Sequence, residues 1–371
     1  EHLRWSLTPG VGPILFRRLV EHFGSAQAAL GASANALKNV EGIGDTLAPQ
    51  IARGRETAPV AAEVELAARH NVRILCQEDE DYPAPLRHIP DPPICLYVRG
   101  RLEPADTVAV AIVGSRRCTT YGREQAYRFG YQLAAQGMTV ISGLARGVDS
   151  ESHKGAIAAG GRTIAVLGNG LADIYPPEHR ELADRICECG AVVSELPMAT
   201  SPNKANFLPR NRIIAGLSLG VMVVEAARRS GSLTTARLAT EYNREVFALP
   251  GRVDSEFSSG TNALIRDGHA RLVTCAQDVL DELGDVGEAL GKVKAESDAP
   301  LSEAAAPARV LTLTNDERRV WQVLEPAEQS IEAIAEKSGL PAAQVAARLI
   351  TLQLKGLARQ LPGNRFVKVR S

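Results

Sequence analysis

The sequence predicts an α/β protein whose main part is a doubly wound, mostly parallel sheet. Between residues 108 and 283, seven nearly continuous apolar runs alternate with segments whose apolar residues recur every three to four positions. Apolar strands joined by helices are typical of a parallel sheet that is covered on both faces. We therefore expect an extended Rossmann-like fold, which holds its ligand at the carboxyl ends of the strands.

The region before the sheet divides into two parts. Residues 1–70 look like short helices separated by the glycine turns "PGVGP" and "VEGIG", as in a small helical domain of the SAM or helix-hairpin-helix type. Turn amides of this kind can contact a DNA phosphate, but with few lysines nearby we favour a structural or weakly binding role. In residues 71–105 the closely spaced prolines of "YPAPLRHIPDPP" rule out a helix and indicate an extended crossing segment.

The extended Rossmann domain is expected from residue 71 to residue 283, and the strands of its sheet can be placed one by one. The predicted strands are "VAVAIVG", "GMTVISG", "RTIAVLG", "AVVSEL", "LGVMVVEA", "REVFALPG" and "ARLVTC". The segments "YGREQAYRFGYQLAAQG" and "TTARLATEYN" have helical spacing and connect strands of this set.

After the sheet, residues 284–309 are rich in Ala, Glu, Pro and Ser and predict a flexible linker. Residues 310–371 contain three helical patterns followed by the hairpin-like "LARQLPGNRFVKV", which suggests a winged helix-turn-helix domain. This part has nine Lys and Arg against six acidic residues, a net charge of about +3. Its expected recognition helix offers few base-reading side chains, so protein contact or weak duplex binding is at least as plausible as sequence-specific DNA readout.

Composition narrows the class of protein. With 371 residues, 45% of them hydrophobic, the chain is long enough for two or three ordinary globular domains. We see neither a leader nor an apolar run approaching the ~18 residues of a membrane span, and the six cysteines are scattered. We therefore expect a cytoplasmic protein with reduced thiols. A net charge of -1 still allows a local basic cleft.

The first candidate site follows the strand "VAVAIVG". Gly114, Ser115, Arg116 and Arg117 come next, without the second glycine that a dinucleotide-binding turn needs, so we expect no redox cofactor. Backbone N–H groups of Gly114 and Ser115 at a helix start, together with Arg116, would suit a phosphate. By itself the motif is equally compatible with a structural turn that carries two solvated arginines.

Other loops at the same edge strengthen the functional interpretation. "SGLARGVDSESHKGA", "LGNGLADIYPPEH", "NKANFLPRNR" and "EAARRSGSLTTA" each follow a strand or open a helix, and each carries polar or basic residues. Phe207 lies three residues after Lys204, a pairing that suits single-stranded nucleic acid because bases stack on a ring while cations follow the backbone. We find no convincing catalytic set and no metal cluster.

Seven motifs in order, including "IVGSR", "SGLARGVDSESHKGA", "NFLPRNRIIAGLS" and "REVFALPGRVDSEFSSGTNALIRDGHA", resemble the DprA/Smf family of natural transformation over nearly the whole chain. The resemblance implies a non-enzymatic protein that binds and protects single-stranded DNA, loads RecA and works as a homodimer, with the dimer surface around residues 253–272. The sequence departs from the family pattern at Ala172 and Thr234, and these differences affect the detailed structure of two loops.

The resemblance carries strand binding over to Arg116, Lys204 and Phe207, with neighbouring residues bordering the same groove. The full set of candidate DNA-binding residues is Gly114, Ser115, Arg116, Arg117, Lys204, Asn206, Phe207, Arg210, Arg212 and Ser232. A second hypothesis is a nucleoside monophosphate hydrolase of the LOG type, in which Arg212, Glu225 and Glu241 would act at the same site. The LOG group has paired glycines in the corresponding turn, and "SGSLTTARLATE" lacks them, which makes the hydrolase the less favoured hypothesis.

Overall fold

The structure is a computed structural model in which two compact units, Glu1–Gly291 and Lys292–Ser371, are each described by themselves. It describes residues 1–284, 315–325, 329–342, 344–345, 348–349, 352, 358–361 and 365–368. The linker predicted for residues 284–309 lies outside these residues except for Gly284. The boundary predicted at residue 70 falls inside the first unit, and a division there stays a prediction.

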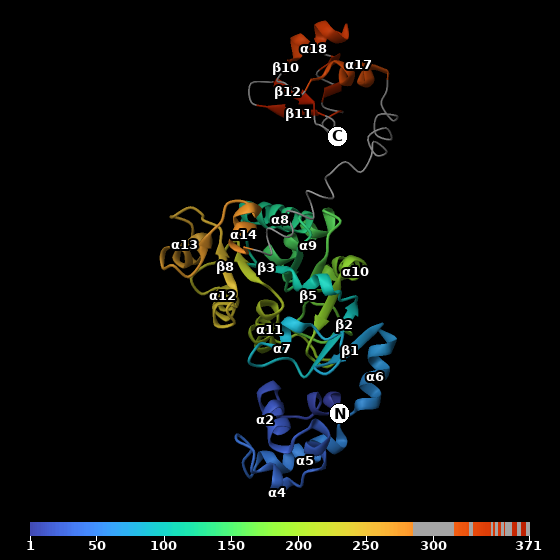
Figure 1. Ribbon diagram of the computed structural model, residues 1–371, viewed down its shortest axis with the longest axis vertical. Helices are drawn as coiled ribbons and strands as arrows, with labels where there is room; N and C mark the ends of the chain where they lie inside the picture. Colours follow the sequence, from blue (N-terminus) through green and yellow to red (C-terminus); the bar gives the residue numbers. More distant parts are fainter. Residues whose placement is uncertain are drawn as a thin grey trace. The chain divides into compact units, whose positions relative to one another are not determined.

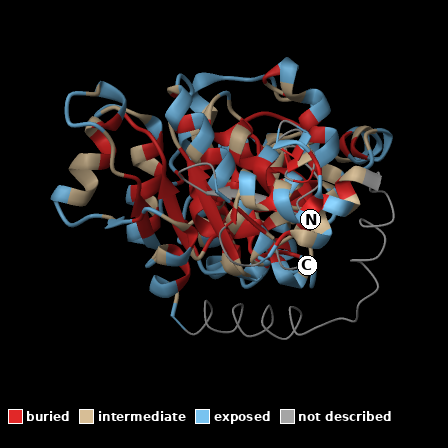
Figure 2. Cartoon of the chain, turned by 90° about the horizontal axis from the view of Figure 1, so that it is seen from above, coloured by how far each residue is buried: buried red, intermediate tan, exposed pale blue. Residues whose placement is uncertain are grey.

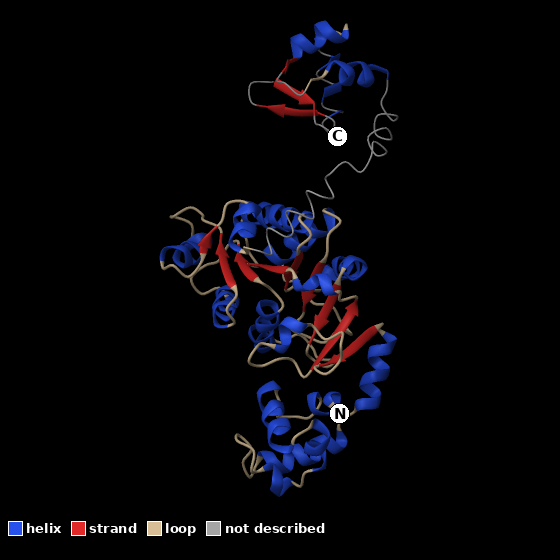
Figure 3. Cartoon of the chain, in the orientation of Figure 1, coloured by secondary structure: helices blue, strands red, loops and turns tan. Residues whose placement is uncertain are grey.

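The N-terminal region of the first unit is helical, as predicted (Figures 1 and 3). Its helices are α1 (His2–Ser6), α2 (Pro13–Phe23), α3 (Ala26–Gly31), α4 (Ala34–Leu37), α5 (Leu47–Thr57) and α6 (Val60–Arg69). Local chemistry sets the boundaries: α2 ends at Gly24 with φ of 85°, a left-handed conformation that glycine adopts easily. Ser25 and Ser33 then cap α3 and α4 by accepting backbone N–H groups.

The segment 71–105 is more regular than predicted. It forms two antiparallel strands, β1 (Val72–Cys76) and β2 (Cys95–Gly100), which join the main sheet through β6. The prediction that prolines exclude any helix here is wrong, because α7 (Ala84–Arg87) forms with Pro85 in its first turn. Proline is tolerated there since the first turn of a helix has no internal acceptor for its N–H groups.

All seven predicted strands are present in the parallel part of the sheet. They are β3 (Ala109–Val113), β4 (Thr139–Ser142), β5 (Thr163–Val166), β6 (Ala191–Ser194), β7 (Gly220–Val223), β8 (Glu245–Ala248) and β9 (Arg271–Leu272). The described chain forms a nine-stranded sheet in the order β1-β2-β6-β5-β4-β3-β7-β8-β9. The chain winds outward in one direction from β3 to β6 and in the other from β7 to β9. The order therefore reverses between β3 and β7, as a doubly wound fold requires.

Helices cover both faces of this sheet (Figure 1). The helices are α8 (Thr120–Ala135), α9 (Val148–Ala158), α10 (Arg180–Cys189), α11 (Lys204–Gly216), α12 (Gly231–Glu241), α13 (Ser259–Arg266) and α14 (Ala276–Glu282). One apolar cluster joins α8, α9 and α14 to one face, and another joins α11 and α12 to the other face. Every residue of β3 to β7 is accordingly buried (Figure 2), which explains their continuous apolar sequences.

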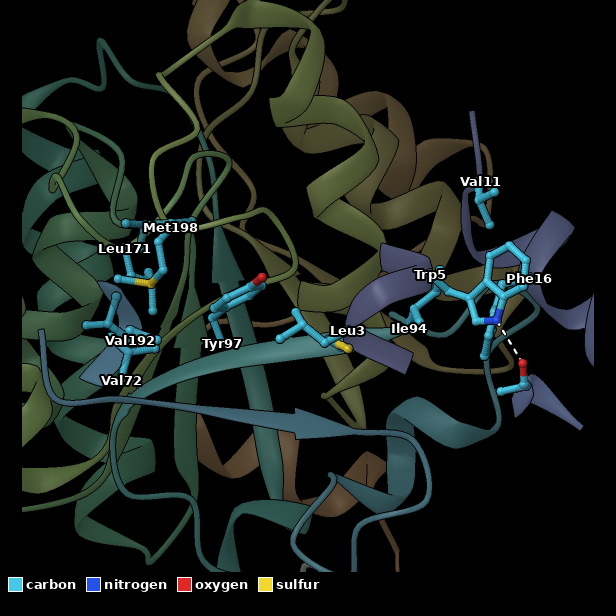
Figure 4. Packing of buried hydrophobic residues seen from close by; sticks show 14 of the residues in the cluster. Leu3, Trp5, Val11, Phe16, Val72, Ile94, Tyr97, Leu171, Val192 and Met198 are labelled. Atoms are coloured by element: carbon cyan, nitrogen blue, oxygen red, sulfur yellow. Dashed lines mark hydrogen bonds between the residues drawn. The ribbon is translucent and has the colours of Figure 1, made fainter. Parts of the chain in front are cut away.

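The helical N-terminal region shares an apolar core with the edge of the sheet (Figure 4). Leu3 and Trp5 of α1 belong to the same buried cluster as Tyr97 of β2 and Met198. The Trp5 indole N–H donates to the carbonyl oxygen of Ala26 at 3.0 Å, so this buried polar group is satisfied. Residues 1–70 are therefore packed onto the sheet by continuous apolar contact.

The second unit contains the elements of a winged helix. They are α17 (Asn315–Val323), β10 (Gln329–Ser330), α18 (Ile331–Ser338), β11 (Ala358–Leu361) and β12 (Arg365–Lys368). The predicted hairpin is present as β11 and β12, and β10 pairs with β12 on its other side. The ammonium of Lys368 lies 3.8 Å from the centre of the Trp321 ring, a cation–π contact within this unit. The predicted recognition helix, residues 341–356, lies mostly outside the described residues.

Candidate functional site

A pocket opens at the point where the strand order reverses. Its volume is about 240 Å³, and it is formed by the loops after β3, β4 and β7 together with one side of α11. Its lining residues are Val113, Gly114, Ser115, Arg116, Ala145, Asp149, Phe207, Leu208, Arg210, Asn211, Ile214, Ser230, Gly231, Ser232 and Thr235. Three of the segments that the sequence predicted to converge, the loops after β3, β4 and β7, thus meet α11 around one cavity, where open α/β sheets bind ligands. The loop after β5 does not line this cavity, and its Tyr175 and Pro176 line the smaller hollow beside it.

The loop after β3 is fixed mainly by its own backbone. A side chain on Gly114 would approach Val148 Cγ2 to 2.6 Å, so the loop passes closely over the start of α9. The Ser115 N–H donates to the carbonyl oxygen of Glu225 at 2.8 Å, and Ser115 Oγ accepts the Arg117 N–H at 3.1 Å. The expectation that the Ser115 amide presents a free donor at a helix start is therefore wrong, and α8 begins only at Thr120.

Arg116 extends from this loop into solvent beside an aromatic ring. Its guanidinium carbon lies 4.8 Å from the centre of the Phe207 ring, a cation–π arrangement. The side chain is exposed, and among the described residues Arg116 forms no salt bridge with a carboxylate. A cation that is held in place but not neutralised is suited to an anionic ligand.

Phe207 occupies the second turn of α11 and is half-buried. A methyl group on Gly168 would come within 2.8 Å of the ring, and the Tyr175 ring lies 6.0 Å away at 36°. A smaller hollow, lined by Arg116, Tyr175, Arg210 and others, lies beside the same ring. Phe207 therefore separates two depressions and keeps part of its surface open to solvent.

Arg210 lines the pocket, but its hydrogen bonds run inward. Its guanidinium donates to the carbonyl oxygens of Gly143 (2.9 Å) and Val166 and to Asn211 Oδ1 (3.2 Å). Burial lowers the pKa of Arg210 to about 10. Through these hydrogen bonds the side chain holds α11 against the ends of β4 and β5, and its guanidinium lies 6.0 Å from the centre of the Phe207 ring. Arg210 therefore helps to keep Phe207 in place.

Asp149 fixes the neighbouring loop in a similar way. Its carboxylate accepts the N–H groups of Gly143 (3.1 Å) and Ala145 (3.3 Å). Burial raises the pKa of Asp149, while nearby Arg210 opposes that rise. These contacts are those of a carboxylate that shapes the loop after β4.

Arg212 is directed elsewhere. It forms buried ion pairs with Asp91 (3.1 Å) and Glu195, and the Tyr242 hydroxyl donates to Asp91 at 3.2 Å. Arg212 is not among the pocket-lining residues. Although the sequence places Arg210 and Arg212 in the same "PRNR" motif, the structure gives them different surroundings.

The N-terminus of α12 forms one wall of the pocket. Ser230 caps this helix by accepting the Ser232 N–H, and its hydroxyl lies 2.7 Å from Ser232 Oγ. Asn211 Nδ2 donates to the Gly231 carbonyl oxygen at 3.3 Å and ties α11 to this wall. The first turn of a helix leaves backbone N–H groups without internal acceptors, which favours a bound anion nearby.

The remaining candidates lie around the pocket and not in it. Lys204 and Arg117 are exposed, Asn206 is half-buried, and none of the three belongs to the lining. Lys204 opens α11, where Asn203 caps the helix by accepting the Ala205 N–H at 3.0 Å. Neither Lys204 nor Arg117 forms a salt bridge within the described part of the chain.

The structure also adds residues that the sequence did not single out. Leu208 lines the pocket while 51% exposed, and Ser230 and Thr235 complete the wall of α12. The helix-opening "SGSLTT" was a usable signal for Ser230, because serine before a helical pattern is a common N-cap. Nothing in the local sequence marks Leu208 as exposed.

The residues of the hydrolase hypothesis do not gather at the pocket. Glu225 is buried, and its carboxylate accepts the Thr119 N–H (2.8 Å) and hydroxyl (2.6 Å). Glu241 pairs with Arg237 on the outer part of α12 at 3.6 Å. No group of three or more His, Cys, Asp or Glu in the described residues could hold a metal ion, and no helix there is long and apolar enough to cross a bilayer.

The strand order reverses at a pocket that holds a helix N-terminus, an arginine without a salt bridge to the described residues and a partly exposed phenyl ring. These features define a Rossmann-type protein for phosphate-bearing ligands. Comparison with known families gives the particular one. The family model for DNA recombination-mediator protein A matches residues 73–284, that for the DprA winged helix domain residues 302–364, and that for the DprA-like N-terminal HHH domain residues 1–38. The chain belongs to this DprA/Smf family.

Individual relatives agree with this assignment. Protein Smf of Synechocystis is 35% identical over 98% of this chain and 97% of its own length, and Protein Smf of Escherichia coli is 40% identical over 81% and 78%. The X-ray structure of DNA processing protein A from Streptococcus pneumoniae matches with a TM-score of 0.67 and 33% identity over 76% of this chain and 95% of that one.

A second solved structure bears on the ligand. It is DNA processing protein A from Helicobacter pylori, described for its single-stranded DNA binding mode. It matches with a TM-score of 0.52 and 33% identity, covering 57% of this chain and 95% of that one.

Proposed function

We propose that this chain binds single-stranded DNA at the edge of its sheet, with Phe207 stacking on a base while Arg116 and Lys204 contact phosphates. The observation that carries the proposal is the Arg116 guanidinium 4.8 Å from the Phe207 ring at the mouth of the pocket. A cation beside a partly exposed aromatic ring suits a nucleotide, because the cation can contact the phosphate while the ring stacks on the flat base. The described binding mode of the Helicobacter pylori relative supports the same ligand.

Local charge favours this ligand despite the net charge of -1. Asp149 in the pocket lining accepts backbone N–H groups, and outside the lining Glu195 is engaged by Arg212 and Glu225 by Thr119. The exposed cations Arg116, Arg117 and Lys204 are not neutralised in this way by any described carboxylate. The surface around the pocket therefore attracts a polyanion, because the local distribution of charge sets the field there.

The test compares the salt dependence of binding in two matched double variants. Removing both cations in Arg116→Ala with Lys204→Ala should weaken binding to an unstructured DNA strand. It should also flatten the slope of log K against log salt by about 1.4, twice the ~0.7 expected per phosphate contact. The control is Arg185→Ala with Lys154→Ala, which removes the same charge from exposed residues outside the pocket lining.

Fluorescence anisotropy at four salt concentrations gives the affinity for the DNA strand and the slope of log K against log salt. Circular dichroism shows whether each variant is folded. The proposal predicts that the control keeps the wild-type slope. Wild-type affinity and slope in the Arg116/Lys204 variant would contradict the site assignment. Duplex and tailed DNA in the same assay identify the preferred form of DNA.

We further propose that the bound strand is protected and passed to RecA, and that the protein works in the cytoplasm as a homodimer. Family membership supports these roles. The relevant assay follows RecA-dependent ATP hydrolysis on single strands already coated with a single-strand-binding protein. The full chain should shorten the lag before hydrolysis, and the Arg116/Lys204 variant should not. An unchanged lag with the wild-type chain would contradict RecA loading.

We propose that binding occurs without turnover. The positions of Arg212, Glu225 and Glu241 support this view, since each is engaged in ion pairs or hydrogen bonds away from the pocket. Incubation of the protein with nucleoside monophosphates, followed by chromatography, should show no released base. Release that is lost in Glu225→Gln would support the hydrolase instead.

A further inference from the structure

Two cysteines face each other across the antiparallel strands β1 and β2. Cys76 ends β1, Cys95 begins β2, and the two are direct partners in the register. Their sulfur atoms lie 3.5 Å apart. Opposite residues on antiparallel strands have Cα atoms roughly 4.5 to 5.5 Å apart. This spacing falls within the approximate 4.4–6.8 Å range over which disulfides form without moving the backbone.

The chain between the two cysteines is held in this arrangement. Gln77 Nε2 donates to the carbonyl oxygens of Pro92 (3.0 Å) and Pro93 (3.1 Å), which brings the two ends of the intervening loop together. The Tyr82 hydroxyl adds a hydrogen bond to Pro93 at 2.9 Å, and the Cys76 N–H donates to Asp79 Oδ2 at 2.7 Å. Because both ends of the loop are fixed, the thiols stay adjacent.

The two thiols differ in access and in acidity. Cys76 is half-buried, whereas Cys95 is 1% exposed. A hydrogen bond from Cys95 lowers the pKa of Cys76, and the same contact together with burial raises the pKa of Cys95. Cys76 is thus the thiol that ionises first and that an oxidant can reach. The more acidic, more accessible thiol of a pair is the one that reacts.

We propose that Cys76 and Cys95 are a redox modification site, a dithiol that a peroxide converts reversibly to a disulfide joining β1 to β2. No other two of the six cysteines, all of which lie in the described residues, are found within hydrogen-bonding distance. Cys187 and Cys189 are two residues apart on α10 and project from different sides of that helix. The site is independent of the proposed DNA-binding residues.

The reaction has two steps that balance. The Cys76 thiolate attacks one oxygen of hydrogen peroxide, forming a sulfenic acid and, with the proton released by the thiol, one water. The Cys95 sulfur then attacks the Cys76 sulfur, the S–S bond forms, and the sulfenic hydroxyl leaves with the Cys95 proton as a second water. Two thiols are oxidised and one peroxide is reduced. A dithiol reductant reverses the change by thiol–disulfide exchange.

The cross-link would fasten the edge of the sheet. In the part of the chain that the structure describes, β1 pairs with β2 alone, and it directly follows α6 of the N-terminal region. The closed loop also contains Asp91, which pairs with Arg212 of α11. A disulfide here restricts the unfolded chain and should raise the melting temperature of the first unit by several degrees.

The experiment treats the reduced full-length protein with hydrogen peroxide, blocks free thiols by alkylation and maps the peptides by mass spectrometry. The expected product is one cross-linked peptide pair containing Cys76 and Cys95, which disappears after dithiothreitol. Cys76→Ser should abolish this product, while the control Cys187→Ser should retain it. The mapping of the wild-type chain does not depend on the folding of either variant.

Two results would overturn the proposal. One is alkylation of both Cys76 and Cys95 after exposure to peroxide that oxidises a reference dithiol. The other is stable oxidation of Cys76 to a sulfinic acid without the cross-link. A melting temperature that does not rise on oxidation, with the cross-link present, would overturn the stabilising role.

Discussion

Phe207 is the residue whose role is easiest to separate from charge. Phe207→Leu keeps an apolar side chain between Gly168 and Tyr175 but removes the flat ring. We expect the affinity for single-stranded DNA to fall about 5- to 150-fold, as losing ~1–3 kcal/mol of stacking implies. The salt slope should stay unchanged, because no phosphate contact is lost.

Two variants control this measurement by anisotropy. Phe207→Trp restores a larger ring and should restore binding. Tyr131→Ala removes a ring that is 44% exposed on α8 and lies outside the pocket lining, and it should have no effect. Full affinity in Phe207→Leu would show that bases do not stack here.

His153 gives the first unit a pH-dependent stability. Its Nδ1 donates to Thr163 Oγ1 at 2.7 Å, since the Thr163 hydroxyl itself donates to Val140, and the buried Nε2 has no hydrogen-bond partner among the described residues. Burial lowers the pKa of His153 to about 3. Below pH ~6.5 the His153 side chain binds a proton in the unfolded chain but stays neutral in the folded protein. Its contribution to the free energy of unfolding is therefore fully present above that pH and is lost as the pH drops toward 3.

We expect His153 to cost about 1.4 kcal/mol of unfolding free energy per pH unit below ~6.5. Urea denaturation between pH 7.5 and 5 measures this slope. His153→Gln should flatten it, whereas His88→Gln, at an exposed histidine, should not. NMR provides an independent check, because the His153 ring should stay neutral at pH 5.

At the level of single residues, the sequence predicted that the loops after β3, β4 and β7 meet, but not what each side chain contacts. The sequence placed Arg116 and Phe207 near the pocket because Arg116 follows a strand and a glycine turn, and because Phe207 lies three residues after Lys204. Arg212 was misjudged because its partners, Asp91 and Glu195, are remote in sequence and their approach depends on the whole fold. The Ser115 amide was misjudged for the same reason, since its acceptor is the carbonyl of Glu225.

Helices α8 and α9 pack with their backbones in contact, which depends on glycine. A methyl group on Gly155 would collide with the Tyr127 carbonyl oxygen, and one on Gly130 with that of Ser152. Gly155→Ala should therefore lower the free energy of unfolding by about 1–3 kcal/mol or more, since neither backbone can shift easily. Gly31→Ala in α3 meets nothing within 4 Å and should be neutral or stabilising. Thermal melts of both variants provide the comparison.

Sequence patterns predicted elements well where burial was uniform. β3 to β7 were found because strands covered on both faces read as unbroken apolar runs. β8 and β9 were found from shorter apolar runs, although both residues of β9 are exposed. β1 and β2 were missed because "VRILC" is only five residues long and does not alternate apolar with polar residues, and because prolines precede "CLYVRG". α7 was missed because a four-residue helix has no periodicity to detect.

For the molecule as a whole, the proposed dimer can be tested at residues 253–272. Val253 is 97% exposed and Leu272, in the edge strand β9, is 51% exposed. Placing charges in an apolar interface is costly, so Val253→Glu with Leu272→Glu should weaken the dimer at least tenfold, about 1.4 kcal/mol. Sedimentation equilibrium measures this change. Val64→Glu, at an exposed valine of α6, should leave the assembly intact, and a dimer that survives the paired change would place the interface elsewhere.

The apolar contact between α1 and β2 has a practical consequence for dissecting this protein. Leu3 and Trp5 cover a surface to which Tyr97 and Met198 also contribute. A shortened version beginning near residue 71 would leave those side chains facing water and prone to self-association. Any assignment of activity to the sheet alone should therefore keep the first helix in place and use point substitutions.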